Sequence, residues 1–177
     1  MKFKRAFATI LVGLAALTAF GCSSSDTSGS NAQVGMPNPM VEVSGIQDIN
    51  DQLGIELDDS FLPSDAKYFI YSGEMAEIQF SEINVNNEEI SVRFRARKNT
   101  DEDISGMYYD NFKEEEIPYG DLIIKHRYLE DNTINVYDIK NGDTSYCVTI
   151  DGNSSQMQLG AIMDKALVTF GIDSTFS

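Results

Sequence analysis

Residues 90–97 read Ile-Ser-Val-Arg-Phe-Arg-Ala-Arg, in which apolar and polar side chains alternate strictly. Successive side chains of a β-strand point to opposite faces, so this stretch predicts a strand with one apolar and one polar face. The apolar set is Val92, Phe94 and Ala96, and the basic set is Arg93, Arg95 and Arg97. A strand of this kind is typical of an antiparallel sheet that packs on one face only.

Further strands are predicted on both sides of this stretch. The candidates are Lys67 to Ser72, Met75 to Ser81, Leu122 to Leu129, Thr133 to Ile139 and Thr144 to Ile150. Turn residues separate them, such as Ser72-Gly73, Asn86-Asn87 and Asn141-Gly142-Asp143. Such short separators favour antiparallel hairpins over crossover helices.

Two helices are predicted at the ends of this strand-rich region. Ser44 and Gln47 have the spacing of a capping box, and the apolar period that follows ends at Gly54. Ser155 and Gln158 repeat that spacing before a second amphipathic segment, which continues to Gly171. We therefore expect an α+β fold: an antiparallel meandering sheet with a short N-terminal helix and a C-terminal amphipathic helix packed on it.

Composition restricts the classes of partner. The chain has 177 residues and a formal charge of -15, with 13 Lys and Arg against 28 Asp and Glu. This length fits one domain. An excess of carboxylates argues against binding to DNA, RNA or anionic lipid surfaces, because these partners need clustered basic side chains. Nucleic acid is therefore not an expected partner.

The first residues have the pattern of an export signal. Lys2, Lys4 and Arg5 precede an uncharged apolar run over residues 6–20. This run is shorter than the ~20 residues that a membrane-spanning helix needs. We therefore expect a cleaved signal peptide over residues 1–21.

The end of that signal, Ala19-Phe20-Gly21-Cys22, resembles the lipobox of bacterial lipoproteins. The resemblance implies that Cys22 receives a diacylglyceryl thioether and becomes the first residue of a protein anchored on the extracytoplasmic face of the cell membrane. The alternative is an ordinary secretory signal with an incidental cysteine. Residues 22–38 are rich in Ser, Gly and Asn and predict a flexible tether, followed by a single domain over residues 39–173.

Several short motifs of this domain resemble a family of uncharacterised extracellular domains found in lipoproteins of Gram-positive bacteria and in some anti-sigma-factor-like proteins. The motifs are Asn38-Pro39-Met40-Val41-Glu42, the helix ending at Leu53-Gly54, Ala76-Glu77-Ile78, the basic strand from Arg93 to Lys98, Asp103-Ile104-Ser105-Gly106 and the closing helix. The resemblance covers most of residues 38–171. It implies a fold and a location, and it carries no catalytic residues or cofactor.

The residue types that perform nucleophilic or zinc chemistry are scarce. The single histidine, His126, lies between Lys125 and Arg127 in an alternating segment, which predicts a half-buried sheet histidine. With Cys22 lipidated, Cys147 has no disulfide partner, and its strand-like surroundings predict a packed or edge-strand thiol. We expect no enzyme and no cofactor, although abundant carboxylates leave a carboxylate-dependent hydrolase as an alternative. The run Glu114-Glu115-Glu116 is interpreted as a solvated acidic segment.

One loop resembles part of a calcium site. Asp101, Asp103 and Ser105 place oxygen ligands at positions 1, 3 and 5 of a calcium loop, with Gly106 at position 6. Position 12 is Phe112 instead of the required glutamate. An acidic turn that caps its own backbone is therefore the favoured interpretation, and these residues remain weak calcium candidates.

The three arginines at 93, 95 and 97 allow two interpretations. They could dock a carboxylate, a phosphate or an acidic peptide, because a guanidinium donates in a planar, bidentate geometry. They could instead pair across the sheet, with Glu77 and Gln79 as the expected partners, and this interpretation is favoured. The segment Tyr108-Tyr109-Asp110-Asn111-Phe112 allows two equally favoured interpretations. Its aromatic side chains could be exposed in a recognition loop, or they could be buried as part of the core.

Taken together, these patterns favour a lipid-anchored domain that binds or senses something at the cell envelope. An envelope protein, a peptide or a small ligand is the expected partner, besides the membrane itself through Cys22. The extracellular hydrolase and a purely structural envelope lipoprotein are the alternatives.

Overall fold

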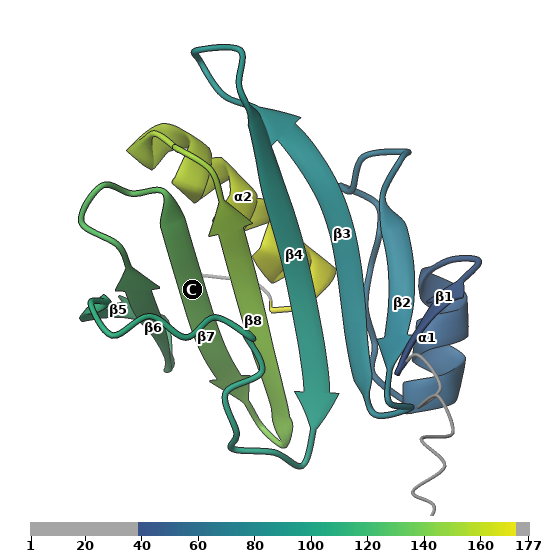
Figure 1. The fold of residues 1–177 in the computed structure, drawn as a ribbon. Helices are drawn as coiled ribbons and strands as arrows, with labels where there is room; N and C mark the ends of the chain where they lie inside the picture. The colour runs from purple at the N-terminus through teal and green to yellow at the C-terminus, as the bar shows by residue number, and fades with distance from the viewer. Residues whose placement is uncertain (1–38, 173–177) are drawn as a thin grey trace, which may run out of the picture. The chain divides into compact units, whose positions relative to one another are not determined.

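The computed structural model describes residues 39–172, and the predicted signal peptide, tether and lipidation site at Cys22 lie outside them. These residues form an eight-stranded antiparallel sheet and two helices (Figure 1). The elements are β1 (Met40–Val43), α1 (Ile46–Leu53), β2 (Lys67–Tyr71), β3 (Met75–Ile83), β4 (Glu89–Lys98), β5 (Lys113–Tyr119), β6 (Leu122–Tyr128), β7 (Ile134–Asn141), β8 (Thr144–Asp151) and α2 (Gln156–Thr169). The predicted α+β class is confirmed.

The strand order shows that the sheet consists of two meanders. Strands run β1-β2-β3-β4-β8-β7-β6-β5, so each half is a meander and β4 pairs with β8 at the centre. Because β5 lies at the far edge, the chain must travel from the centre of the sheet to that edge through residues 99–112, the crossover loop. In Figure 1 this loop passes in front of the sheet, whereas α2 lies behind it.

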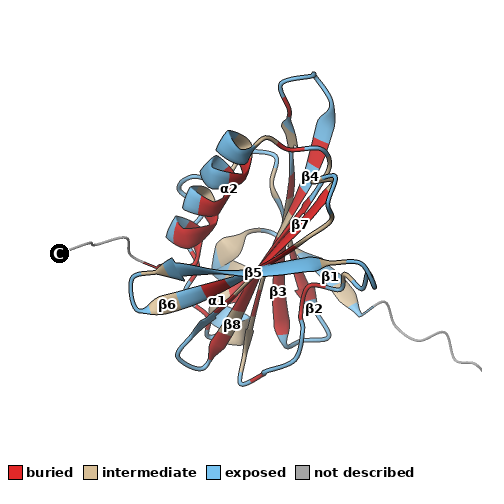
Figure 2. Cartoon of the chain, turned by 90° about the vertical axis from the view of Figure 1, so that its left-hand side faces the viewer, coloured by how far each residue is buried: buried red, intermediate tan, exposed pale blue. Residues whose placement is uncertain are grey.

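Both helices contribute to one hydrophobic core on the same face of the sheet. Ile49 of α1 and Leu159, Ile162 and Leu167 of α2 are buried in one cluster with the alternating apolar residues of the central strands. Phe94 lies in the middle of it, with ring centroids 5.2 Å from Phe80 and 5.6 Å from Phe170. Figure 2 shows the buried residues of α2 on the side that faces the sheet. The predicted apolar face is thus the one that packs against the helices.

The start of α1 differs from the prediction. Gly45 is the N-cap, and the Ser44 side chain caps no helix amide. Instead the Ser44 amide and hydroxyl both donate to the Asp48 carboxylate, at 2.9 and 2.8 Å. The capping box from Ser44 to Gln47 was therefore wrong, because a charged carboxylate accepts these two hydrogen bonds better than a neutral amide would. The predicted end at Gly54 is confirmed by its φ of 63°.

The second helix begins as predicted. Ser155 is its N-cap, its hydroxyl accepts from the Gln158 amide, and the Gln158 side chain accepts from the Ser155 amide. The hairpin turn at Ser72-Gly73, between β2 and β3, is also confirmed: both residues have positive φ, and the Glu74 amide donates to the Tyr71 carbonyl at 3.1 Å.

Two strands were not predicted, and both are edge strands. β1 has four residues, and β5 has the sequence Lys-Glu-Glu-Glu-Ile-Pro-Tyr, which lacks an apolar alternation. An edge strand needs less burial, and acidic side chains and a proline discourage pairing with another molecule. The Glu114-Glu115-Glu116 run is exposed, as predicted, but it is part of a strand.

The core position of Phe94 gives a test of the packing. Phe94→Ala should lower the free energy of unfolding by about 3–5 kcal/mol, because a large cavity opens between the sheet and α2. Urea unfolding followed by circular dichroism would measure it. Phe61→Ala is the matched control, since the Phe61 side chain is 63% exposed. Equal losses in the two variants would contradict this core.

Candidate functional site

The face of the sheet away from both helices carries the polar side chains of the strands, and we refer to it as the open face. One row across it shows the register: Lys67 lies opposite Gln79, Gln79 opposite Arg93, and Arg93 opposite Thr149. The same row continues through Val136 to Arg127. Because directly opposed residues share a face, all three predicted arginines of β4 lie here.

Part of the open face is covered by the crossover loop. Ile104, Met107 and Phe112 of the loop pack against a small second hydrophobic cluster on the sheet. The sheet residues of that cluster are Met75, Ile134, Val136 and Cys147. The loop therefore forms a partial second layer opposite the helices.

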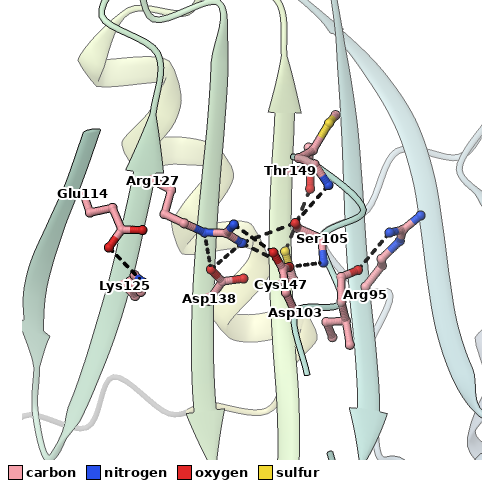
Figure 3. A network of polar contacts seen from close by, with 11 residues as sticks. Arg95, Asp103, Ser105, Glu114, Lys125, Arg127, Asp138, Cys147 and Thr149 are labelled. Atoms are coloured by element: carbon pink, nitrogen blue, oxygen red, sulfur yellow. Dashed lines mark hydrogen bonds and ion pairs between the residues drawn. The ribbon is translucent and has the colours of Figure 1, made fainter. Parts of the chain in front are cut away.

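A polar cluster around Arg127 holds the loop on the sheet (Figure 3). From β6, the Arg127 guanidinium donates to both carboxylate oxygens of Asp103, at 2.8 and 3.1 Å, and to the Ser105 hydroxyl at 3.2 Å. It also donates from Nε to Asp138 of β7, at 2.9 Å. Arg95 adds a second attachment by donating to the Ile104 carbonyl at 2.8 Å. We call the set Asp103, Ser105, Arg127 and Asp138 the loop clamp.

The two carboxylates of the loop clamp have pKa values shifted in opposite directions. Burial disfavours the charged form of Asp103, but hydrogen bonds from Arg127 and Ser105 outweigh it and hold the pKa below its ordinary value. For Asp138 burial dominates and raises the pKa, although the Arg127 charge opposes that shift. The hydrogen bonds and charge of Arg127 thus help to outweigh the effect of burial on the pKa of Asp103, but they do not outweigh it for Asp138.

Cys147 lies beneath the loop on β8 and is fully buried. Burial and the neighbouring Asp138 charge raise the pKa of its thiol well above the ordinary value. The predicted packed thiol is confirmed, and a thiol of this kind is chemically unreactive while the loop stays in place.

The three arginines of β4 have different surroundings. Arg95 forms the predicted cross-strand ion pair with the buried carboxylate of Glu77, which lies directly opposite. Arg97 pairs with Glu74 and, at 3.2 Å, with Glu102. Arg93 lies opposite Gln79, but the predicted pair between them does not form, because the Gln79 amide donates to Glu77. The Arg93 guanidinium forms no ion pair or hydrogen bond within the described residues. The three arginines therefore do not form a uniform row of free guanidinium groups.

The three calcium candidates contact different basic side chains. Asp101 is 97% exposed and pairs with Lys140 at 3.1 Å, whereas Asp103 and Ser105 bind Arg127. The local backbone capping predicted for the turn is present, since the Ser105 amide donates to Asp103. Within residues 39–172, no group of three His, Cys, Asp or Glu side chains is placed to hold a metal ion.

His126 is a sheet histidine, as predicted, but it is buried on the helix-covered face and not half-buried. Its ring is stacked on both Tyr128 and Tyr137, and its two nitrogens contact Glu115 at 2.8 Å and Asn135 at 3.0 Å. Burial and the Glu115 charge raise the pKa of Tyr137 to about 12.

The aromatic segment of the crossover loop is divided between core and surface. Phe112 packs in the second cluster, and the Arg127 guanidinium lies 5.6 Å from its ring centroid. Tyr108 is 77% exposed. The segment is therefore exposed at Tyr108 and packed at Phe112, and a recognition role for its exposed end stays a prediction.

The open face of the described residues carries several grooves. One, of about 410 Å³, adjoins the loop clamp, and another, of about 460 Å³, lies beside Arg95, Arg97 and the crossover loop. A further groove, of about 510 Å³, lies over β2, β3 and β4, and we call it the β2–β4 groove. Its polar lining is Asp65, Lys67, Gln79, Ser81, Ser91, Arg93 and Asp151, and none of these residues belongs to the crossover loop. Sequence reasoning found Arg93 but missed Lys67, because a lone lysine at the start of a strand is an ordinary surface pattern.

Comparisons with protein-family models, with curated proteins and with solved structures find no match for this chain. The resemblance stated from the short motifs therefore stays a prediction. In the part of the chain that the structure describes, neither helix is long and apolar enough to cross a membrane.

The lowered pKa of Asp103 predicts how pH affects the loop clamp. A carboxyl whose pKa is lower in the folded state stabilises the fold above its ordinary pKa of 3.8, and this contribution disappears as the pH falls through the folded value. Asp103→Asn should therefore lower the free energy of unfolding by about 1–3 kcal/mol at pH 7, and the difference from the unsubstituted protein should shrink below pH 4.

Urea unfolding at pH 3, 5 and 7 would measure this difference. Asp101→Asn is the matched control, because Asp101 belongs to the same loop but is almost fully exposed, so little change is expected at any pH. A loss for Asp103→Asn that stays constant across this pH range would contradict the assigned role of the charge.

Proposed function

We propose that this chain is a lipid-anchored extracytoplasmic protein that binds a ligand on the open face of its sheet. The observation that carries the binding part is the β2–β4 groove, a polar hollow of about 510 Å³ on the face opposite α1 and α2. The anchoring part is supported by the basic start, the apolar run and the lipobox-like Ala19-Phe20-Gly21-Cys22. The expected setting is the envelope of a Gram-positive bacterium.

The position of the groove supports binding. Most of its lining comes from β2, β3 and β4, with Asp151 added from β8 and Asp65 from the segment before β2. The backbones of these strands are fixed by continuous ladders from β2 to β8. Side chains on paired strands keep their mutual spacing better than side chains on loops, which favours selective recognition. On the opposite face the same strands contribute Ile78, Val92 and Phe94 to the core, so the groove has a rigid support.

A specific observation keeps the hydrolase as a second candidate. Asp103 and Asp138 line the groove beside the loop clamp, and their pKa values are shifted apart, as in pairs that act as acid and base. However, both carboxylates contact Arg127, and both oxygens of Asp103 are hydrogen-bonded. This arrangement accounts for the pair as an attachment of the loop, so binding is the better-supported function.

The membrane anchor is tested by intact-mass analysis and detergent partitioning of the natively expressed protein beside a Cys22→Ala variant. We expect a diacylglyceryl mass and partitioning into the detergent phase, and both should be lost in the variant because the thioether needs Cys22. A protein that remains in the aqueous phase and carries no lipid would contradict the anchor and favour a secreted protein.

The binding face is tested with two single-site labels in a Cys22→Ala chain. Ser91→Cys places an environment-sensitive fluorophore in the β2–β4 groove, and Val168→Cys places it on the exposed side of α2. Addition of cell-wall digests and polar envelope extracts should change the fluorescence saturably at position 91 and leave position 168 unchanged. No saturable change at position 91, or equal changes at both positions, would argue against a ligand site on the open face.

A further inference from the structure

Almost every basic side chain in the described residues has a partner. Those in ion pairs are Arg95, Arg97, Lys113, Lys125, Arg127, Lys140 and Lys165. Lys98 donates to the Gly54 carbonyl. Within residues 39–172, only the side chains of Lys67 and Arg93 form no ion pair and no hydrogen bond. This is unexpected in a chain with 28 Asp and Glu against 13 Lys and Arg.

These two side chains lie in the same groove and in the same row of the sheet. Lys67 of β2 and Arg93 of β4 both lie opposite Gln79 of β3, one from each side. Because neighbouring strands are ~4.8 Å apart, their backbones are separated by about 10 Å, a distance that two long side chains can close over the amide between them. Both residues line the β2–β4 groove.

No carboxylate lies directly opposite Arg93 in the sheet. Two residues further along β4, Arg95 lies opposite Glu77 and forms an ion pair with it. Arg93 has Gln79 on one side and Thr149 on the other, and neither carries a charge. The same strand thus presents one neutralised guanidinium and one that is available to an external anion.

The remaining lining restricts the ligand. Asp65 and Asp151 carry the other charges of the groove, and Ser81 and Ser91 add hydroxyl groups. Two carboxylates beside two cations disfavour a ligand with many negative charges. They favour a ligand with a single oxyanion group and with hydrogen-bond donors elsewhere.

We propose that Lys67 and Arg93 bind the single oxyanion group, a carboxylate or a phosphate, of a small ligand whose donor groups face Asp65, Asp151 and Ser91. Planar guanidinium and compact ammonium groups bind both oxyanions, so the two share this chemistry. This inference rests on the proposed function, because it assigns a ligand class to the same groove.

The test is an amide chemical-shift titration of the natively expressed protein in detergent with inorganic phosphate and, separately, with acetate. Chloride is used to keep the ionic strength constant. We expect saturable shifts confined to amides around the β2–β4 groove, with a Kd on the order of 1 mM for at least one anion. Lys67→Gln and Arg93→Gln should each weaken binding at least ~10-fold, which corresponds to the loss of ~1.4 kcal/mol. The anion that binds more tightly identifies the source of the oxyanion.

The control is Arg97→Gln, which removes an arginine from the same strand and the same face but one that already pairs with Glu74. It should keep the anion affinity within about twofold, since its charge is neutralised within the sheet. Equal losses in Arg93→Gln and Arg97→Gln, or the lack of saturable shifts with either anion, would overturn the site. A fluorescence response at position 91 to envelope extracts that is unchanged by Arg93→Gln would overturn it as well, yet would leave the proposed function standing.

Discussion

The pairing of β4 with β8 is the constraint on which the rest of the structure depends. It joins two four-stranded meanders at the centre of the sheet and places β5 at the far edge. The chain must therefore cross one face between Lys98 and Lys113. The helices occupy one face with a continuous core, so the crossover loop lies on the other. A loop on a sheet needs partners for its buried polar groups, and Arg95 and Arg127 supply them.

The crossover loop is attached by two arginines, and each of them contacts several acceptors. Arg127 contacts two carboxylates and a hydroxyl, and Arg95 binds both Glu77 and a loop carbonyl. A buried charge is costly unless several hydrogen bonds satisfy it, so each cation is shared among several acceptors. The clamp can therefore be explained by its role in attaching the loop, and no catalytic task is needed to account for the shifted pKa values of Asp103 and Asp138.

Most of the fold could be predicted from periodicity, and most of the site could not. The alternation in residues 90–97 and the Ser155 cap are local signals, and both agree with the structure. Edge strand β5 was not predicted because its acidic sequence lacks a buried face. The pairing of Arg95 with Glu77 was predictable because adjacent hairpin strands bring opposite charges together. The contact between Asp103 and Arg127 depends on the crossover, which follows from strand order and leaves no pattern in the local sequence.

The difference between Arg93 and Arg95 is the strongest reason to regard the open face as more than a solvated surface. Both belong to the same strand and point to the same side, and each has one residue of β3 directly opposite. A glutamate at position 79 would repeat the pair made by Glu77, in a chain where glutamate is abundant. The chain has a glutamine there, and Lys67 lies on its other side, equally unpaired. A role in stability alone would favour pairing both cations, whereas a role in binding requires that they stay free until an anion arrives.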